Sequence, residues 1–261
     1  MKPESSPSFA VIIPACDEEA CIGPVLDELS SVLDRETFLV AVGVNGSADA
    51  TAEIARSRGA FVAETPHRGY GHGCQAAIDL VNQISPGVAA YIFFAGDGAS
   101  DPRDIPRLVA AFQQGYAFVL GARTGRFSNW RTMHFSHVVA NFAVALWCGI
   151  LAGRWYRDLA PLRLIDRNLF EAIQPREMTF GWTIEPQIAA VRLGAAICEV
   201  DASERPRLAG QQKVSGVTWR RTFMIGCRIL AAGWRARLRF RGAASVQRMG
   251  KALVVQPQRT A

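Results

Sequence analysis

One acidic residue, Asp97, suggests the most informative chemistry in this chain. It follows an apolar run in the segment YIFFAGDGASDP, which spans Tyr91–Pro102, and it stands between Gly96 and Gly98. A buried strand that ends in one carboxylate between small residues is suited to holding a divalent cation against a phosphate. The segment therefore predicts a site for Mg²⁺ or Mn²⁺. Two residues before Asp97, Ala95 stands where a second acid would strengthen such a site.

Polar and glycine-rich segments follow three other predicted strands. They read PACDEE at 14–19, NGSAD at 45–49 and HRGYGHG at 67–73. A dinucleotide-binding site would need G-x-G-x-x-G directly after the first strand, and a P-loop would need a glycine-rich stretch that ends in Gly-Lys-Ser or Gly-Lys-Thr. Neither pattern is present in the sequence, which argues against both of these nucleotide-binding classes.

The elements that position these segments alternate in type between residues 9 and 121. We expect strands at 9–13, 38–44, 60–63, 91–95 and 118–121, and helices at 22–33, 48–58, 74–84 and 105–113. Ser47 or Asp49 predicts the start of the second helix, and Asp101 with Pro102 predicts the start of the fourth. This alternation indicates an α/β fold with a mainly parallel sheet, in which ligands bind beyond the carboxyl ends of the strands. The residues after the strands are therefore expected to converge.

Length and composition favour one large domain with a C-terminal appendage. The chain has 261 residues, of which 49% are hydrophobic and 20% are charged, enough for a substantial core. Its six cysteines show no CxxC pairing and are expected to be buried, reduced thiols. No signal peptide is expected, because residues 1–8 are short and polar.

Charge is distributed unevenly along the chain. The net charge is +6, and residues 219–261 contain many arginines but no aspartate or glutamate, so the remainder is slightly acidic. A cationic extension of this kind favours an anionic partner. We expect a domain over residues 1–216, followed by a basic amphipathic helix and flexible tail over residues 217–261.

The ordered motifs resemble those of the family 2 glycosyltransferases of the GT-A fold, and among them the dolichol-phosphate mannose synthase-like, polyprenyl-phosphate-using branch. The resemblance covers roughly residues 9–216. It is carried by IIPACDEE, VNGSADAT, HRGYGHG and FFAGDGASDP, and then by LGAR at 120–123, DLAPLR at 158–163, FGWTIEPQ at 180–187 and RPRLAGQQKVSG at 205–216. It implies a Rossmann-like sheet flanked by helices. It also implies sugar transfer from a nucleoside diphosphate sugar, with inversion at the anomeric carbon.

The resemblance also assigns residues to the donor site. The positions implied to bind the nucleotide sugar are Pro14, Ala15, Glu18, Val44, Arg68, Gly71, Gly96 and Asp97. Glu18 would accept hydrogen bonds from the ribose or the base, although acids at 17–19 also suit the first turn of a helix. Asp97 would hold the metal on the diphosphate, and its alternative role is that of a turn or capping residue.

Catalytic and acceptor-binding residues follow from the later motifs. The resemblance implies catalytic roles for Asp97, Arg163 and Glu185. It implies phosphate or acceptor binding for the cations Arg123, Arg207 and Lys213. Glu185 would be a general base only for a hydroxyl acceptor, because a phosphate acceptor is already ionised. A structural cap or an ion pair with an arginine is the alternative for Glu185.

Three positions depart from the family pattern. Val44 replaces an aspartate that reads the base, Ala95 replaces the first acid of the DxD motif, and Ala99 stands where some relatives have a polar side chain. A metal at this site would depend more on diphosphate oxygens and water, which Mg²⁺ tolerates. These losses keep open a non-catalytic relative that binds nucleotide or membrane without turnover. A glycosyltransferase that acts on a hydroxyl acceptor also remains an alternative.

Two apolar segments bear on membrane binding. Residues 135–151 are apolar, but His137 and Asn141 make this stretch short of a membrane span. Residues 217–240 place tryptophans among arginines, as in a helix that lies in the interface of an anionic membrane. The alternative is a helix packed on the core. We therefore expect a lipid-linked or phosphorylated acceptor, peripheral association with the cytoplasmic face of the membrane, and no nucleic-acid partner.

Overall fold

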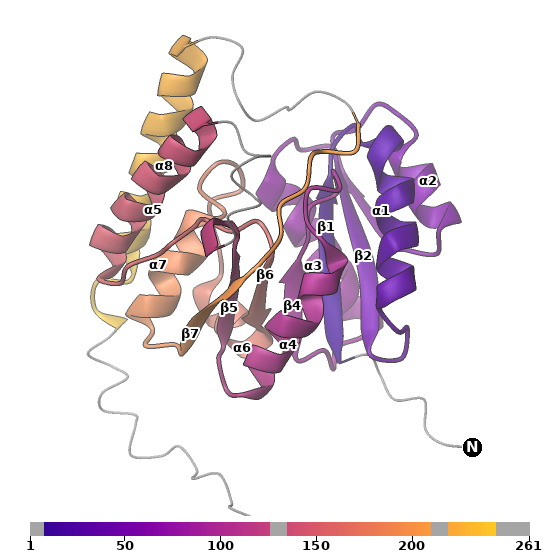
Figure 1. Cartoon of the computed structure of the whole chain (residues 1–261), viewed down its shortest axis with the longest axis horizontal. Coiled ribbons are helices and arrows are strands. Elements are labelled where there is room, and N and C mark those ends of the chain that lie inside the picture. The colour runs from indigo at the N-terminus through magenta and orange to yellow at the C-terminus, as the bar shows by residue number, and fades with distance from the viewer. Residues whose placement is uncertain (1–7, 126–134, 210–218, 244–261) are drawn as a thin grey trace, which may run out of the picture.

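A seven-stranded sheet forms the centre of the computed structural model, which describes residues 8–125, 135–209 and 219–243 (Figure 1). The strand order is β3-β2-β1-β4-β6-β5-β7. The strands are β1 (Phe9–Ala15), β2 (Phe38–Asn45), β3 (Phe61–Thr65), β4 (Ala90–Phe93), β5 (Phe118–Ala122), β6 (Arg163–Asp166) and β7 (Ile197–Asp201).

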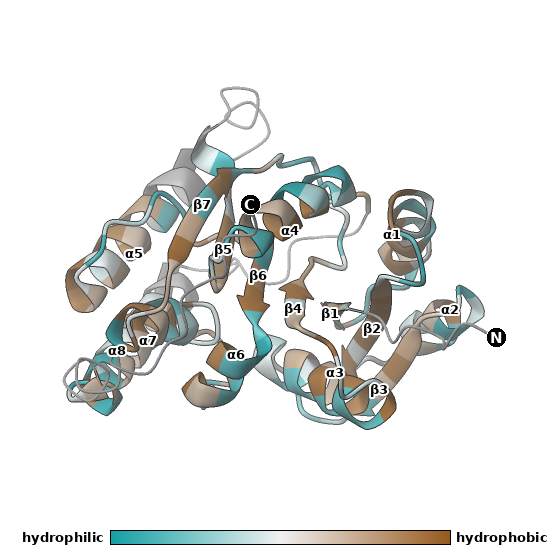
Figure 2. Cartoon of the chain, turned by 90° about the horizontal axis from the view of Figure 1, so that it is seen from below, coloured by the Kyte–Doolittle hydropathy of each residue, from teal (hydrophilic) through white to brown (hydrophobic). Residues whose placement is uncertain are grey.

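Helices cover both faces of this sheet. They are α1 (Glu19–Val32), α2 (Thr51–Ser57), α3 (Tyr70–Ile84), α4 (Ile105–Gln113), α5 (Phe135–Ala152), α6 (Arg167–Ile173), α7 (Ile184–Arg192) and α8 (Trp219–Arg239), with 3₁₀ turns η1 (Pro102–Asp104) and η2 (Arg123–Gly125). Figure 2 shows α1 and α4 on one side of the sheet and α3 and α6 on the other. One hydrophobic cluster includes residues of α1, α2 and α4, and the other includes residues of α3, α5, α6 and α7.

Alternation along β1 explains why both faces must be covered. Ala10 and Ile12 contribute to one cluster, whereas Val11 and Ile13 contribute to the other, and all four are fully buried. A strand that is apolar on both faces is typical of the interior of an α/β sheet. The fold therefore buries β1 at its centre and brings the carboxyl end of this strand beside those of β2 and β4.

The predicted mainly parallel α/β fold is confirmed. The β1–β2, β1–β4, β2–β3 and β5–β7 pairs are all parallel. β6 runs antiparallel to both β4 and β5. The prediction did not include β6 or β7. Residues 163–166 are too few to show a clear period of two in the sequence.

The predicted start of the second helix is corrected by the structure. α2 begins at Thr51, with Ala50 as its N-cap residue, rather than at residue 48. Ser47 accepts a hydrogen bond from Asp17, and Asp49 accepts one from Glu19. These side chains therefore bind the loop after β1, and Asp49 also accepts from the backbone of Thr51. The predicted capping role of Asp101 is confirmed, because it accepts from the Arg103 backbone at the start of η1.

The C-terminal helix α8 packs beside α5 and α7 (Figure 1). Ala232, Gly233 and Ala236 are buried on this helix and Phe240 is buried directly after it, whereas Trp234 and Leu238 are half exposed. The helix therefore has one face on the core and an apolar outer face. Among the helices described, none has the length and apolar character needed to cross a membrane.

Several arginines of α8 form contacts within the protein. Arg235 forms an ion pair with Glu177, at 2.6 Å. Arg237 donates to the carbonyl of Leu151, and Arg239 pairs with Glu185 at 2.8 Å. The expected boundary between residues 216 and 217 lies outside the described residues.

The cysteines are only partly as expected. Cys21, Cys74 and Cys148 are buried, but Cys227 is exposed on α8. Burial raises the pKa of the Cys148 thiol to about 12.

Candidate active site

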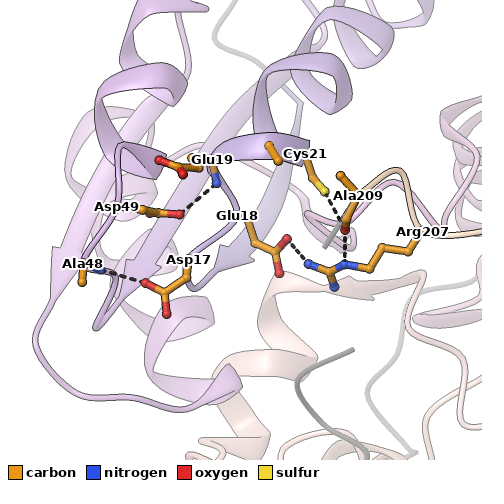
Figure 3. Close-up of a pocket in the computed structure, with 9 residues that line it drawn as sticks. Asp17, Glu18, Glu19, Cys21, Ala48, Asp49, Arg207 and Ala209 are labelled. Atoms are coloured by element: carbon orange, nitrogen blue, oxygen red, sulfur yellow. Dashed lines mark hydrogen bonds and ion pairs between the residues drawn. The ribbon is translucent and has the colours of Figure 1, made fainter. Parts of the chain in front are cut away.

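The loop after β1 is fastened to the loop after β2 through Asp17. Its backbone N–H donates to Ser47 Oγ at 2.9 Å, and its carboxylate accepts from the Ala48 N–H at 2.8 Å (Figure 3). Asp17 has φ of 51°, a left-handed conformation that aspartate tolerates better than most residues. Arg68, from the loop after β3, donates to Asp17 at 3.3 Å and to the carbonyl of Gly46 at 3.2 Å. Arg68 thus brings a largely exposed cation to the meeting point of three loops.

Glu18 and Glu19 have different roles at the start of α1. Glu19 accepts from the Ala50 N–H and donates its own backbone N–H to Asp49, both at 3.1 Å. The Glu18 backbone N–H donates to Thr51 Oγ1 at 2.8 Å. The Glu18 carboxylate points toward Arg207 and pairs with it (Figure 3). The predicted acidic segment thus supplies one carboxylate to the pocket and uses the others to fix the loops.

Val44 and Ala15 pack in the core. They face each other in the β1–β2 register, and Val44 is only 3% exposed. Val44 belongs to the hydrophobic cluster that also contains Ile22 and Ala55. Neither side chain is placed to contact a nucleotide, which argues against their predicted side-chain roles. Pro14 is half-buried near the end of β1.

Asp97 lies where the loop after β4 meets the segment after β7. The Leu208 N–H donates to the Asp97 carbonyl at 3.1 Å, and the Arg205 N–H donates to the Ala99 carbonyl at 2.8 Å. Gly98 has φ of +80°, a conformation that glycine adopts without a steric penalty. Next to Asp97, Gly96 lies against β1, because a Cβ at Gly96 would be 3.2 Å from Ile13 Cγ2.

Arg207 joins the two carboxylates that come from different loops. Its guanidinium forms ion pairs with Glu18 and with Asp97, the latter at 3.3 Å, and its Nε donates to the Ala209 carbonyl at 2.6 Å. Partial burial opposes the charge, but Glu18 and Asp97 together raise the pKa of Arg207 above its ordinary value. Arg207 is therefore the cation that balances the charges of the Glu18 and Asp97 carboxylates at this edge of the sheet.

A pocket of about 450 Å³ opens beside this ion pair (Figure 3). Its lining includes four acidic side chains and Arg207, and it comes from the loops after β1, β2 and β7 and from the start of α1. The lining residues are Asp17, Glu18, Glu19, Ala20, Cys21, Ala48, Asp49, Arg207 and Ala209. The pocket has the size of a small-molecule site and lies beyond the carboxyl ends of parallel strands, where α/β folds bind ligands.

Arg123 is engaged with two acids. It forms a bidentate pair with the fully buried Asp158, at 2.8 and 2.9 Å, and an ion pair with Glu204 at 3.3 Å. Burial raises the pKa of Glu204 to about 7, although Arg123 lowers it. Burial also opposes ionisation of Asp158, but Arg123 brings the pKa of this carboxyl below its usual value. These contacts argue against the predicted role of Arg123 as a separate phosphate clamp.

Arg163 and Glu185 are buried, and neither lines the pocket. Arg163 is 2% exposed and donates to the carbonyls of Thr183 and Ala160, and burial lowers its pKa. The Glu185 carboxylate accepts from two backbone N–H groups, those of residues 176 and 177, and pairs with Arg239. The structure therefore argues against catalytic roles for Arg163 and Glu185 and favours the capping alternative for Glu185.

Gly71 is a packing position rather than a pocket residue. Its N–H donates to the carbonyl of Met178 at 2.9 Å. A Cβ at Gly71 would lie 2.6 Å from Trp182 Cε3.

Lys213, the remaining predicted phosphate- or acceptor-binding residue, falls outside the described residues.

Sequence reasoning missed Glu204 and Asp158 as partners of Arg123. Each acid lies at a motif that the sequence shows, because Glu204 directly precedes RPR at 205–207 and Asp158 is the first residue of DLAPLR. Neither motif shows that the two acids meet one arginine, because 45 residues lie between them in the chain, and only the pairing of β7 with β5 brings the two acids together.

Asp97 fits a metal site of limited protein ligation. Within the described ranges, no group of three or more His, Cys, Asp or Glu residues could hold a metal ion. Mg²⁺ is commonly held by one or two carboxylates together with substrate phosphates and water. The partly exposed Asp97 carboxylate fits this arrangement, with diphosphate oxygens as the other ligands.

Two known proteins are similar to this chain in sequence. A dolichyl-phosphate hexose transferase of Haloferax volcanii is 30% identical over 207 residues, which cover 79% of this chain and 86% of that protein. An uncharacterized glycosyltransferase of Mycobacterium tuberculosis is 29% identical over 211 residues, which cover 80% of this chain and 90% of that protein.

A solved structure shows the same fold. Glucosyl-3-phosphoglycerate synthase from Mycobacterium tuberculosis, in complex with Mn²⁺, uridine diphosphate and phosphoglyceric acid, has a TM-score of 0.67 and 21% identity. The match covers 88% of this chain and 78% of that one. The model of the family described as Glycosyl transferase family 2 matches residues 10–172. The chain therefore belongs to glycosyl transferase family 2, and it is a glycosyltransferase with the GT-A fold.

Proposed function

We propose that this glycosyltransferase moves a sugar from a nucleoside diphosphate sugar to a lipid-linked phosphate, with inversion at the anomeric carbon. The observation that carries the proposal is the pairing of Asp97, Glu18 and Arg207 beside one pocket at the carboxyl edge of the sheet. Acids and a cation from separate loops match the mixed charge of a metal-bound diphosphate.

In this proposal, Asp97 holds Mg²⁺ or Mn²⁺ on the diphosphate. The metal would offset the charge that develops on the departing nucleotide. Arg207 and Arg68 flank the pocket and its neighbouring loops, so they are the candidates for binding phosphate oxygens. Glu18 lies at the pocket wall, where its carboxylate would accept hydrogen bonds from a ribose or base.

A phosphate acceptor suits the contacts of Glu185. An ionised phosphate needs no general base, and Glu185 is already bound by two backbone N–H groups and Arg239. One similar protein points the same way, since it is named a dolichyl-phosphate hexose transferase.

The outer faces of α5 and α8 support a lipid-linked acceptor and peripheral membrane association at the cytoplasmic face. Phe142, Leu146 and Ile150 are exposed at spacings of four on α5, and Leu230, Trp234 and Leu238 repeat this spacing on α8. Neither helix contains an acidic residue. Apolar stripes on two helices without acidic residues, of which α8 also carries arginines, suit the interface of an anionic membrane.

Donor binding and turnover test the catalytic part of this proposal. A thermal-shift panel of UDP-, GDP- and dTDP-sugars, with and without Mn²⁺, identifies the donor. A donor at about 100 times its Kd stabilises the fold by about 2.7 kcal/mol. Release of free nucleotide with a polyprenyl phosphate and Mg²⁺ or Mn²⁺ then measures transfer. A thermal shift without any nucleotide release would instead support the non-catalytic alternative.

Liposome sedimentation tests the membrane part separately. Joint substitution of Leu230, Trp234 and Leu238 by alanine should reduce binding to anionic vesicles. Phe61→Ala is the matched control, because Phe61 is a comparably exposed apolar residue on β3. Equal binding by the triple variant and the control would contradict the assignment of α8 to the membrane.

A further inference from the structure

One guanidinium, that of Arg207, connects two carboxylates from separate loops. Its NH1 lies 3.3 Å from Asp97 Oδ2, and its NH2 pairs with Glu18 Oε2. A third contact, from Nε to the Ala209 carbonyl at 2.6 Å, fixes the plane of the guanidinium. All three charged side chains are less than one-third exposed, so solvent screens their interactions less than it screens surface pairs.

Both carboxylate oxygens of Asp97, the predicted metal ligand, already accept a contact from the protein. Oδ2 of Asp97 faces Arg207, and Oδ1 accepts the Ala99 N–H at 3.1 Å. Ala95, two residues earlier, carries no oxygen with which to ligate. A divalent cation that approaches Asp97 must therefore compete with a cation that the chain already supplies.

A diphosphate changes this competition. Arginine binds phosphate oxygens through strong, often bidentate hydrogen bonds, so a diphosphate in the neighbouring pocket offers Arg207 another anionic partner. If Arg207 turned toward a diphosphate, Asp97 Oδ2 would be free to hold a metal together with phosphate oxygens. Nucleotide and metal binding would then be coupled through one side chain.

We propose that Arg207 acts as an internal cation that keeps divalent metal from Asp97 until a nucleoside diphosphate draws it away. The inference rests on the proposed donor site and adds an order to it, in which the metal binds together with the diphosphate. Arg207 is thereby a positioning residue for the metal as well as a phosphate-binding candidate.

Binding of Mn²⁺ alone provides a readout that does not depend on transfer. Free Mn²⁺ is measured by electron paramagnetic resonance during titration of the full chain, with no nucleotide present. Arg207→Gln should bind Mn²⁺ about tenfold more tightly than the unsubstituted protein, which corresponds to about 1.4 kcal/mol. The reason is that this substitution leaves two carboxylates, Asp97 and Glu18, without their shared cation.

Arg205→Gln is the matched control. Arg205 lies two residues away on the same segment, where it pairs with Glu28 at 2.6 and 2.8 Å and donates to the carbonyl of Ser100 at 2.7 Å. This variant should change Mn²⁺ affinity by less than about twofold, because removal of a pair that does not involve Asp97 has little effect there. Adding Asp97→Asn to Arg207→Gln should abolish the gain.

A nucleotide arm measures the coupling. In the unsubstituted protein, saturating UDP or GDP should strengthen Mn²⁺ binding more than it does in Arg207→Gln, by about the same tenfold factor, since linkage is reciprocal. Arg207→Lys keeps the charge but not the two-pronged geometry, so its affinity for Mn²⁺ alone should lie between those of the other two proteins.

The outcomes separate this inference from the proposed function. Equal Mn²⁺ affinity in Arg207→Gln, Arg207→Lys and the unsubstituted protein would overturn it, as would an equal gain in Arg205→Gln. A gain confined to the Arg207 variants supports the inference even if no sugar transfer is found, whereas transfer without that gain supports only the proposed function.

Discussion

Glu204 should make the stability of this protein fall as pH rises through neutrality. Burial raises the pKa of this carboxyl from 4.5 to about 7, against the lowering effect of Arg123. Between these two values the folded chain holds a proton that the unfolded chain has released. The free energy of unfolding therefore decreases as pH rises across this window, and the contribution is complete below about pH 4.5.

The structure sets the magnitude of this effect. At about 1.36 kcal/mol for each pH unit of difference, the rise from 4.5 to about 7 corresponds to at most about 3 kcal/mol. Glu204→Gln mimics the protonated carboxyl and does not titrate. The free energy of unfolding of this variant, relative to the unsubstituted protein, should increase by about 1–3 kcal/mol between pH 5 and pH 8.

Urea unfolding at a series of pH values measures this difference. Glu53→Gln is the control, because Glu53 is an exposed acid on α2 and its substitution should leave the pH profile parallel to that of the unsubstituted protein. Parallel profiles for Glu204→Gln as well would refute the reasoning, since they would show that Glu204 is ionised in the same pH range in the folded and unfolded chain.

Three further substitutions test the site and its supports. Asp97→Asn should lower metal-dependent transfer at least about a hundredfold in a chain that still unfolds cooperatively, and retained Mn²⁺-dependent turnover would remove Asp97 from the metal site. Asp158→Asn should cost about 3–5 kcal/mol in urea unfolding, because it leaves the buried Arg123 guanidinium without its bidentate partner; a loss below about 1 kcal/mol would mean that solvent screens this pair. Gly71→Ala should cost about 1–3 kcal/mol, because the added methyl would lie 2.6 Å from Trp182, and an unchanged denaturation midpoint would show that α3 relaxes freely.

The sequence predicted the part of the fold that depends on local pattern. The runs at 9–13 and 38–44 are apolar and β-rich, and both became strands near their expected bounds. The second helix began three residues later than expected. Ser47 and Asp49 resemble N-cap residues in the sequence, but both bind the loop after β1, and only the folded sheet brings that loop close enough to compete.

The candidate site was predictable as a set of motifs but not as a set of contacts. Asp97, Glu18 and Arg207 were each identified from sequence, and the structure brings them together. Val44 and Arg163 were identified in the same way, yet they lie in the core. A motif position specifies residue type, whereas the direction of a side chain depends on strand register and on the helices that cover each face.

By itself, the sequence determined the alternation of strands and helices, the family, and the residue types along the sheet edge, because these follow from short-range periodicity and motif order. Only the tertiary structure decided which charges meet. Arg207 lies 110 residues from Asp97 and 189 from Glu18 along the chain. Their ion pairs exist because β7 adds to the far edge of the sheet and the segment after it returns across the loop that follows β4.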